Sequence, residues 1–147
     1  MILWHGWADQ SIPPAGTLDY YQRLWEHNGG LRTTQQFARL FMVPAVYHCA
    51  LFDGGYTLNR FDPFPALVDW VEHREAPDKV IAEQRDGQQH LVRSRPVFPY
   101  PLQARYRGSG SIDDAASFVG SPPATPPHNV IHWAGDYLYH LEGSTAP

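Results

Sequence analysis

The sequence predicts an α/β fold that contains the last parallel strands of a sheet with their flanking helices, followed by an irregular Pro-rich tail. Two short apolar segments each run into a loop that carries an ionisable residue, and a helical pattern separates them. A second helical pattern follows, and this alternation is typical of a parallel sheet. The chain has 147 residues, 43% of them apolar and 14% aromatic, enough for one packed domain.

The first expected strand, Ile2–Trp4, is short and β-prone, and in the loop after it Gly6 permits a tight turn. An amphipathic helix over about residues 15–28 comes next, preceded by two prolines and ended by two glycines. Its apolar stripe consists of four side chains: Leu18, Tyr21, Leu24 and Trp25.

The second expected strand spans residues 36–43 and stops at Pro44, because proline lacks the N–H group that a strand uses. A loop follows, and a second helix begins at Pro63 or Phe64 and continues to Glu75. Its apolar stripe is expected at four positions: Ala66, Leu67, Trp70 and Val71.

Beyond residue 77 the pattern changes. Two short strands, Val80–Ala82 and Leu91–Arg95, are joined by a turn at Asp86-Gly87. One helical turn is expected within Ile112–Val119, with Asp113 or Asp114 near its start. We place a boundary after residue 119, so that residues 120–147 form a Pro-rich tail of unknown role.

Composition argues against several classes of function. The net charge is -4 and no basic block occurs, which argues against nucleic-acid or membrane-surface binding through a cationic patch. No apolar run approaches the roughly 20 residues of a membrane span. The histidines and acids lack the short ligand spacing of a zinc site. The chain begins in a strand-like segment without a signal peptide, so we expect a portion of a longer protein.

Asp9 and His48 are the candidate catalytic residues, because each follows a predicted strand. A carboxylate in such a place can orient an imidazole, although an Asp also caps helices and turns well. A histidine can carry the proton between a serine and a leaving alcohol. Among eight histidines, His48 is singled out by its strand-end position and by the adjoining Cys49. His5 is expected to pack or to hydrogen-bond near the first loop.

Several short motifs follow one another along the chain: His5-Gly6-Trp7-Ala8-Asp9, Tyr20-Tyr21, Val43-Pro44 with His48-Cys49, Asp69-Trp70-Val71 with Ala76-Pro77-Asp78, and Arg95-Pro96 through Tyr106 with Gly108-Ser109-Gly110. In these motifs, over roughly Ile2–Val119, the chain resembles the C-terminal part of the tannase and feruloyl esterase family.

The resemblance implies the C-terminal part of an α/β-hydrolase catalytic domain over residues 1–119, and hydrolysis of esters of aromatic acids such as gallate and ferulate. It implies a Ser-Asp-His triad in which Asp9 is the acid and His48 the base. Cys49 would form a disulfide with a cysteine beside the serine. The serine, its cysteine and a lid with a calcium site would lie upstream, so no cofactor is expected in this chain. The family is mostly exported, which favours a periplasmic or extracellular location.

The nucleophile is the residue that this sequence lacks. No serine lies in the G-x-S-x-G pattern of a nucleophile elbow, and Ser109, in the nearest imitation, comes after His48 in the chain. We therefore expect the chain to be inactive as an esterase on its own. The alternative is a non-catalytic remnant or an interaction module, since exposed apolar strands favour association. The His48 loop also departs from the family, with Ala45-Val46-Tyr47 in place of Gly-Met-Gly.

Two alternatives concern neighbouring residues. Cys49 could itself be a nucleophile, but adjacent side chains usually point apart, which disfavours a Cys49–His48 pair. Five aromatic residues flank the two loops and either form a wall for a phenolic acyl group or pack in the core: Trp4, Trp7, Tyr47, Phe52 and Tyr56.

Overall fold

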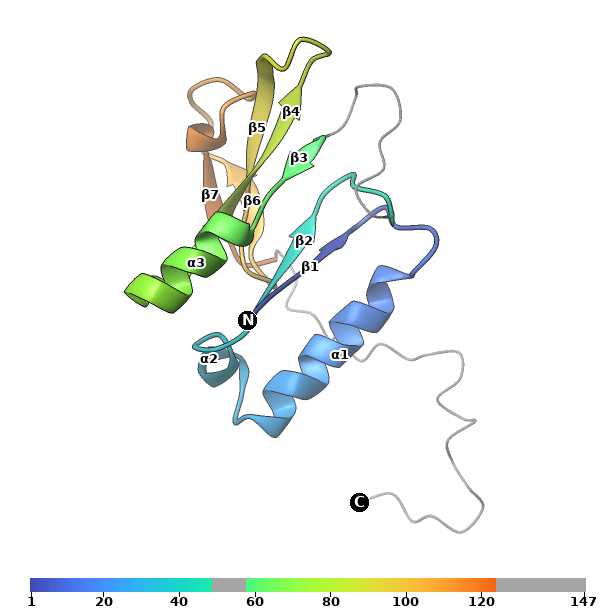
Figure 1. Cartoon of the computed structure of the whole chain (residues 1–147), viewed down its shortest axis with the longest axis vertical. Coiled ribbons are helices and arrows are strands. Elements are labelled where there is room, and N and C mark those ends of the chain that lie inside the picture. Colours follow the sequence, from blue (N-terminus) through green and yellow to red (C-terminus); the bar gives the residue numbers. More distant parts are fainter. Residues whose placement is uncertain (49–57, 124–147) are drawn as a thin grey trace.

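The computed structural model describes residues 1–48 and 58–123, in which helices flank a pair of parallel strands and antiparallel strands extend to one side (Figure 1). The elements in chain order are β1 (Ile2–Gly6), α1 (Pro14–His27), α2 (Leu31–Thr34), β2 (Arg39–Val43), β3 (Arg60–Phe61), α3 (Phe64–His73), β4 (Val80–Arg85), β5 (Leu91–Val97), β6 (Gln103–Tyr106), the 3-10 helix η2 (Ala115–Ser117) and β7 (Phe118–Ser121).

Strands β1 and β2 confirm the predicted strand-helix-strand unit. They run parallel, with Ile2 opposite Arg39 and Gly6 opposite Val43, and α1 is the longest element of the connection between them. Because the strands are parallel, both carboxyl ends lie at one edge of the pair. The loops that carry Asp9 and His48 therefore leave from the same edge.

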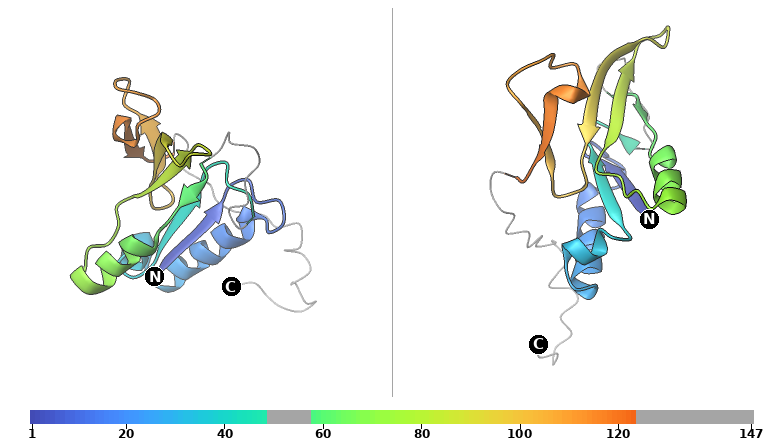
Figure 2. Two further views of the ribbon diagram at one scale, coloured as in Figure 1. Left: turned by 45° about the horizontal axis from the view of Figure 1, so that its top comes forward. Right: turned by 90° about the vertical axis from the view of Figure 1, so that its left-hand side faces the viewer.

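The alternation of side chains along β2 divides the core into two clusters, because successive residues of a strand point to opposite faces. On one face, Leu40 and Met42 pack with fully buried Tyr21 of α1, whose hydroxyl donates to the Ala38 carbonyl at 2.9 Å. The predicted stripe of α1 lies in this cluster. Figure 2 shows α1 lying alongside the β1–β2 pair. The other face packs against α3 and the antiparallel strands through the following residues: Phe41, Val43, Val46, Leu58, Val80, Ala82 and Val97.

The β4–β5 hairpin is confirmed. Its turn is closed by the Gln89 amide donating to the Asp86 carbonyl at 2.9 Å. Strand β3 pairs with β4, and an isolated bridge between Phe41 and Pro99 joins the segment after β5 to β2. The antiparallel strands therefore lie on the side of β2 away from β1 (Figures 1 and 2).

The second strand begins at Arg39 and not at residue 36 as predicted. Residues 31–34 form the short helix α2, and its carbonyls accept hydrogen bonds from the next amides, including that of Ala38 to Thr34 at 2.8 Å. Those bonds keep the segment turned, and Phe37 is left 43% exposed. The predicted α3 stripe is also wrong at Val71, which is 73% exposed because it lies on the outer side of the helix.

The helical turn predicted within Ile112–Val119 is confirmed as η2, and its N-cap Asp114 accepts a hydrogen bond from the Ala116 amide at 2.9 Å. Strand β7 follows and pairs with β6, with Gly120 opposite Ala104. The boundary placed after residue 119 therefore falls inside β7. Residues from 124 onward, most of the predicted tail, lie outside the described part of the chain. Within the described residues no helix is long and apolar enough to cross a membrane.

Candidate active site

The loops after β1 and β2 are joined by backbone hydrogen bonds. The Trp7 amide donates to the Val43 carbonyl at 2.9 Å, and the Ala8 amide donates to the Val46 carbonyl at 3.1 Å. Gly6 allows this approach, because a Cβ atom at Gly6 would lie 2.1 Å from the Val46 oxygen. Gly6 was predicted to permit a tight turn through its conformational freedom. A tight turn does begin at Gly6, where the Asp9 amide donates to the Gly6 carbonyl at 3.2 Å. Gly6 has no positive φ, however, so it is needed because it has no side chain where the two loops meet.

Gly6→Ala is expected to destabilise the chain by about 2 kcal/mol or more, because a backbone carbonyl cannot move aside as a flexible side chain can. Urea denaturation followed by circular dichroism measures the change. Gly87→Ala is the matched control, since a Cβ there meets nothing within 4 Å. Equal stability of the two variants would contradict the proposed close packing.

Asp9 and His48 lie together, as their places in the sequence suggested. Asp9 Oδ2 is 2.9 Å from His48 Nδ1, so the imidazole donates to the carboxylate. The Asp9 side chain is only 7% exposed, whereas that of His48 is 38% exposed. With Nδ1 protonated and bonded, a neutral His48 carries its lone pair on Nε2. This arrangement suits a base that is oriented from one side and receives a proton on the other.

The other carboxylate oxygen of Asp9, Oδ1, stabilises the loop that follows β1. Oδ1 accepts hydrogen bonds from the amides of Ser11 at 2.9 Å and Ile12 at 2.8 Å. The two interpretations of Asp9 are thus compatible, since one oxygen organises a turn while the other faces the imidazole. Partial burial acts to raise the Asp9 pKa, but the hydrogen bonds from Ile12, His48 and Ser11, with the charge of His48, outweigh it and lower the pKa to about 2.

Because the pKa of Asp9 falls from 3.8 to about 2 on folding, its ionised form stabilises the folded chain. This contribution is fully present above pH 3.8 and is lost as the pH falls through about 2. We expect the melting temperature to decrease as the pH is lowered from 3.8 to about 2. The decrease should be smaller in Asp9→Asn, which has no carboxylate at this position to protonate. Thermal melts across this range measure the difference, and parallel curves would contradict the assignment.

His5 supports the same carboxylate. Its Nε2 lies 3.0 Å from the Ile12 carbonyl, which can only accept, so Nε2 carries a hydrogen. The same nitrogen is 3.3 Å from Asp9 Oδ2, while Nδ1 is 2.6 Å from the Thr17 hydroxyl. The expectation that His5 forms hydrogen bonds near the loop is confirmed. The part played by Thr17 had no signal in the sequence, because only the fold brings helix α1 against β1.

The remaining predicted site positions are not part of the Asp9–His48 arrangement. Cys49, Phe52 and Tyr56 lie outside the described residues, so neither the disulfide nor the nucleophile interpretation of Cys49 is tested. Ser109 lies in an exposed loop between β6 and η2. No group of three or more His, Cys, Asp or Glu side chains within residues 1–48 and 58–123 is placed to hold a metal ion.

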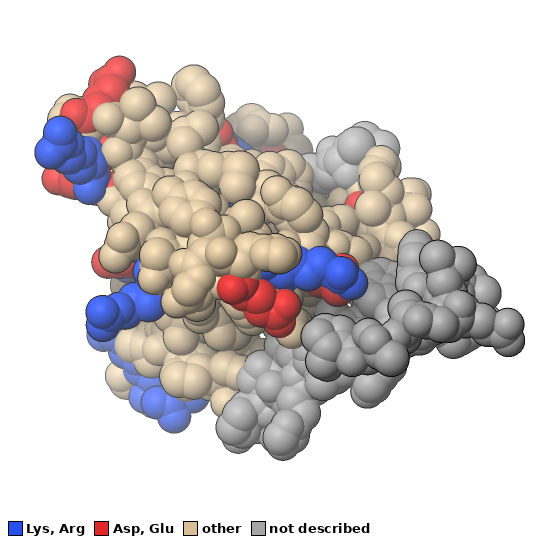
Figure 3. Space-filling view, turned by 90° about the horizontal axis from the view of Figure 1, so that it is seen from below, with Lys and Arg blue, Asp and Glu red and all other residues tan. Residues whose placement is uncertain are grey.

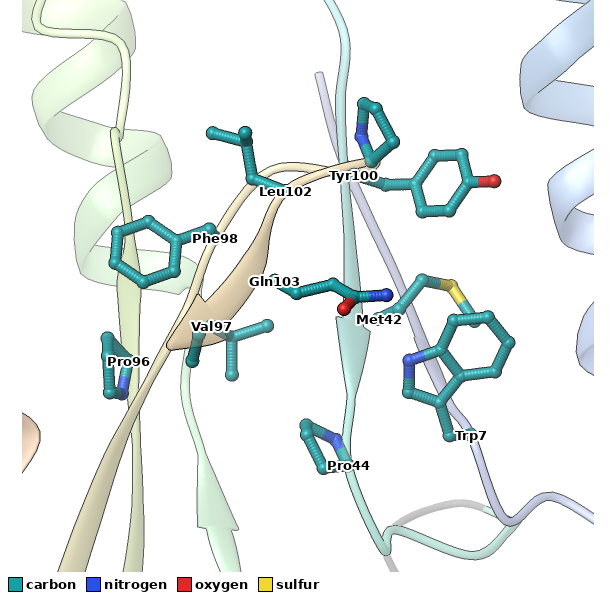
Figure 4. A pocket seen from close by; sticks show the side chains of 11 residues that line it. Trp7, Met42, Pro44, Pro96, Val97, Phe98, Tyr100, Leu102 and Gln103 are labelled. Carbon is teal, nitrogen blue, oxygen red and sulfur yellow. The ribbon is translucent and has the colours of Figure 1, made fainter. Parts of the chain in front are cut away.

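The aromatic side chains beside the loops differ in environment. Trp4 packs against Phe61 with ring centroids 5.6 Å apart, which favours the packing role. Tyr47 is half-buried. Trp7 is 47% exposed and lines a cavity of about 270 Å³. Figure 4 shows Met42 and Gln103 lying close to Trp7 in this cavity. Gln103 was not a sequence candidate, because it is almost a hundred residues from Trp7.

The family pattern described as tannase and feruloyl esterase matches residues 1–120. The chain belongs to this family. It is 42% identical over 125 residues to a mono(2-hydroxyethyl) terephthalate hydrolase of Piscinibacter sakaiensis, covering 84% of this chain and 20% of the relative. It is 36% identical over 121 residues to a probable feruloyl esterase of Arthroderma benhamiae, covering 80% of this chain and 22% of the relative.

The solved structures agree with this family. The crystal structure of feruloyl esterase B from Aspergillus oryzae matches with a TM-score of 0.71 and 26% identity, covering 82% of this chain and 26% of that chain. The described residues therefore have a mixed α/β structure that corresponds to part of the family fold. The chain spans about a fifth to a quarter of the length of these relatives.

Proposed function

We propose that this chain carries the acid and the base of a serine ester hydrolase that acts on esters of aromatic acids, with a serine outside these 147 residues as the nucleophile. The observation that carries the proposal is the 2.9 Å hydrogen bond between Asp9 and His48 at the common edge of two parallel strands. Membership of a family of esterases supports the reaction class.

In the proposed reaction, His48 Nε2 takes the proton of the serine hydroxyl as its oxygen attacks the ester carbonyl. The imidazolium then donates that proton to the leaving alcohol, and an acyl-serine remains. Water then attacks the acyl carbonyl and loses a proton to His48, and the imidazolium returns that proton to the serine oxygen as its bond to the acyl group breaks and the acid is released. Asp9 stays ionised throughout, which agrees with the lowered pKa of its carboxyl group, and stabilises the imidazolium.

The location of the parent protein and the role of Cys49 follow as parts of the same proposal. A disulfide between Cys49 and a cysteine beside the serine would tie the two halves of the site together and would require an oxidising compartment. We place the parent protein in the periplasm or outside the cell. Calcium, where the family holds it, would be bound in a lid that these residues do not include.

A graft tests the proposal. Residues 1–120 replace the corresponding segment of the Piscinibacter mono(2-hydroxyethyl) terephthalate hydrolase, which is 42% identical to this chain. We expect the graft to hydrolyse mono(2-hydroxyethyl) terephthalate, and the 147-residue chain alone to show no hydrolysis. A graft that melts cooperatively near the temperature of its parent but lacks activity would contradict the proposal.

A non-catalytic interaction module is a second candidate, favoured by one observation. Within the described residues β1 pairs on one side only, and Trp4 on that strand is 38% exposed. An unpaired strand edge is a template for another strand. Tight association of the chain with a protein that contributes no serine, together with an inactive graft, would favour this function over the esterase.

A further inference from the structure

An open cleft of about 660 Å³ lies between α2, the start of β2 and the end of α3. It is at the amino ends of β1 and β2, whereas Asp9 and His48 are at their carboxyl ends. It is therefore separate from the candidate active site. The residues that line it are mainly cationic and polar: Arg32, Gln35, Gln36, Arg39, Trp70, Arg74 and Ala76.

Arg39 is held firmly at the base of the cleft. Its Nε donates to the Gln35 carbonyl at 3.2 Å, and its Nη1 donates to the Pro77 carbonyl at 2.7 Å and to the Asp78 carboxylate at 3.2 Å. Its guanidinium lies over the Trp70 ring, 5.6 Å from the ring centroid. Among the described residues no hydrogen bond uses Nη2 of Arg39, so this nitrogen can serve a ligand.

Arg32 and Arg74 approach the same cleft from two other elements. Arg32 is on α2, and Arg74 is the left-handed C-cap of α3, with φ of 64°. Both side chains are exposed, and neither forms an ion pair with an acid of the described residues. The cleft thus has three guanidinium groups, of which Arg39 alone has a carboxylate partner.

Little negative charge opposes these groups. No Asp or Glu is among the lining residues of the described chain, and Asp78, which pairs with Arg39, is 97% exposed at the margin. Glu75 is also exposed and adjoins Arg74 in the chain. Figure 3 views this end of the molecule and shows several basic side chains toward the left, the side on which α2 and α3 lie in Figure 1, with acidic side chains beside the uppermost of them. The chain as a whole has a net charge of -4, so the cationic cleft stands out.

We infer that this cleft binds the carboxylate of a small ring-bearing acid. Guanidinium groups bind carboxylates through paired, charge-assisted hydrogen bonds, and three that lack full pairing favour an anion over a neutral ligand. The volume exceeds what a carboxylate alone would fill, and the half-buried Trp70 offers an aromatic contact for a ring. An aromatic acid and a sugar acid share this chemistry. The inference does not depend on the esterase proposal.

Titration calorimetry of the 147-residue chain with benzoate, galacturonate and inorganic phosphate tests the inference. We expect at least one carboxylate to bind, and binding to weaken as salt is added. Stronger binding of benzoate would identify an aromatic acid, and stronger binding of galacturonate a sugar acid. Binding of phosphate without either carboxylate, or no binding at all, would overturn the inference.

Two substitutions locate the binding. Arg32→Gln and Arg74→Gln are each expected to weaken it roughly tenfold, because each removes a charge-assisted contact. Neither side chain forms a hydrogen bond or ion pair with the described residues, so both variants should melt like the original chain. Arg107→Gln, an exposed arginine after β6, is the matched control and should leave the affinity unchanged. Unchanged affinity in the Arg32→Gln, Arg74→Gln double variant would also overturn the inference.

Discussion

His48→Ala in the active graft is expected to lower kcat by roughly five to six orders of magnitude, with little change in KM. The imidazole is the group that would move the proton in both halves of the reaction. His5 also approaches the Asp9 carboxylate, at 3.3 Å, but its two ring nitrogens contact the Ile12 carbonyl and the Thr17 hydroxyl, so neither is open to take a proton. Stopped-flow and long-incubation assays of mono(2-hydroxyethyl) terephthalate hydrolysis measure the two rates.

His27→Ala serves as the control for this change. His27 is exposed at the end of α1, away from the two loops, and its removal should leave kcat within about twofold. A graft that keeps more than a hundredth of its activity without His48 would mean that another group acts as the base.

Asp9→Asn in the same graft is expected to lower kcat by about 10⁴-fold. An amide that turns its NH₂ group toward Nδ1 favours the tautomer with the proton on Nε2, and that tautomer cannot accept the serine proton. If the amide instead keeps its oxygen toward Nδ1, it still lacks the charge that stabilises the imidazolium. Steady-state kinetics should show the loss in kcat and not in KM.

A double variant separates catalysis from folding at Asp9. If Asp9 acts through His48, the Asp9→Asn, His48→Ala graft should be no slower than His48→Ala alone, because the two residues act as a unit. Additive losses, or a graft that melts far below its parent, would point to a structural role for the carboxylate through the Ser11 and Ile12 amides.

The parts of the fold that could be predicted have strong local signals. The period of Leu18, Tyr21 and Trp25 indicates a helix, and their burial against β2 agrees with it. The turn at Asp86-Gly87 is equally local. The elements that were missed depend on distant partners. Strand β6 is exposed along its length and pairs with β7, where Tyr106 contacts Phe118 edge to face at 5.7 Å.

In the candidate site, too, features with a local sequence signal could be predicted and features that depend on distant partners could not. Asp9 and His48 could be chosen because each follows a strand and lies in a family motif, but their catalytic roles remain predictions. The bond of Asp9 Oδ1 to its own loop was foreseen only as an alternative to catalysis, whereas both interactions occur together. The support from His5 and the close contact at Gly6 depend on the packing of two loops, which no local pattern records.

The parallel pair β1–β2 also fixes the distance between the two proposed binding sites. Its five residues per strand, at about 3.3 Å each, separate the arginine cleft from the Asp9–His48 edge by roughly 16 Å. A small acid bound at one end therefore cannot touch an ester held at the other. Any influence of the first ligand on the second would have to pass through the strands as a shift of Arg39 relative to His48, and its size would measure how stiff this pair is.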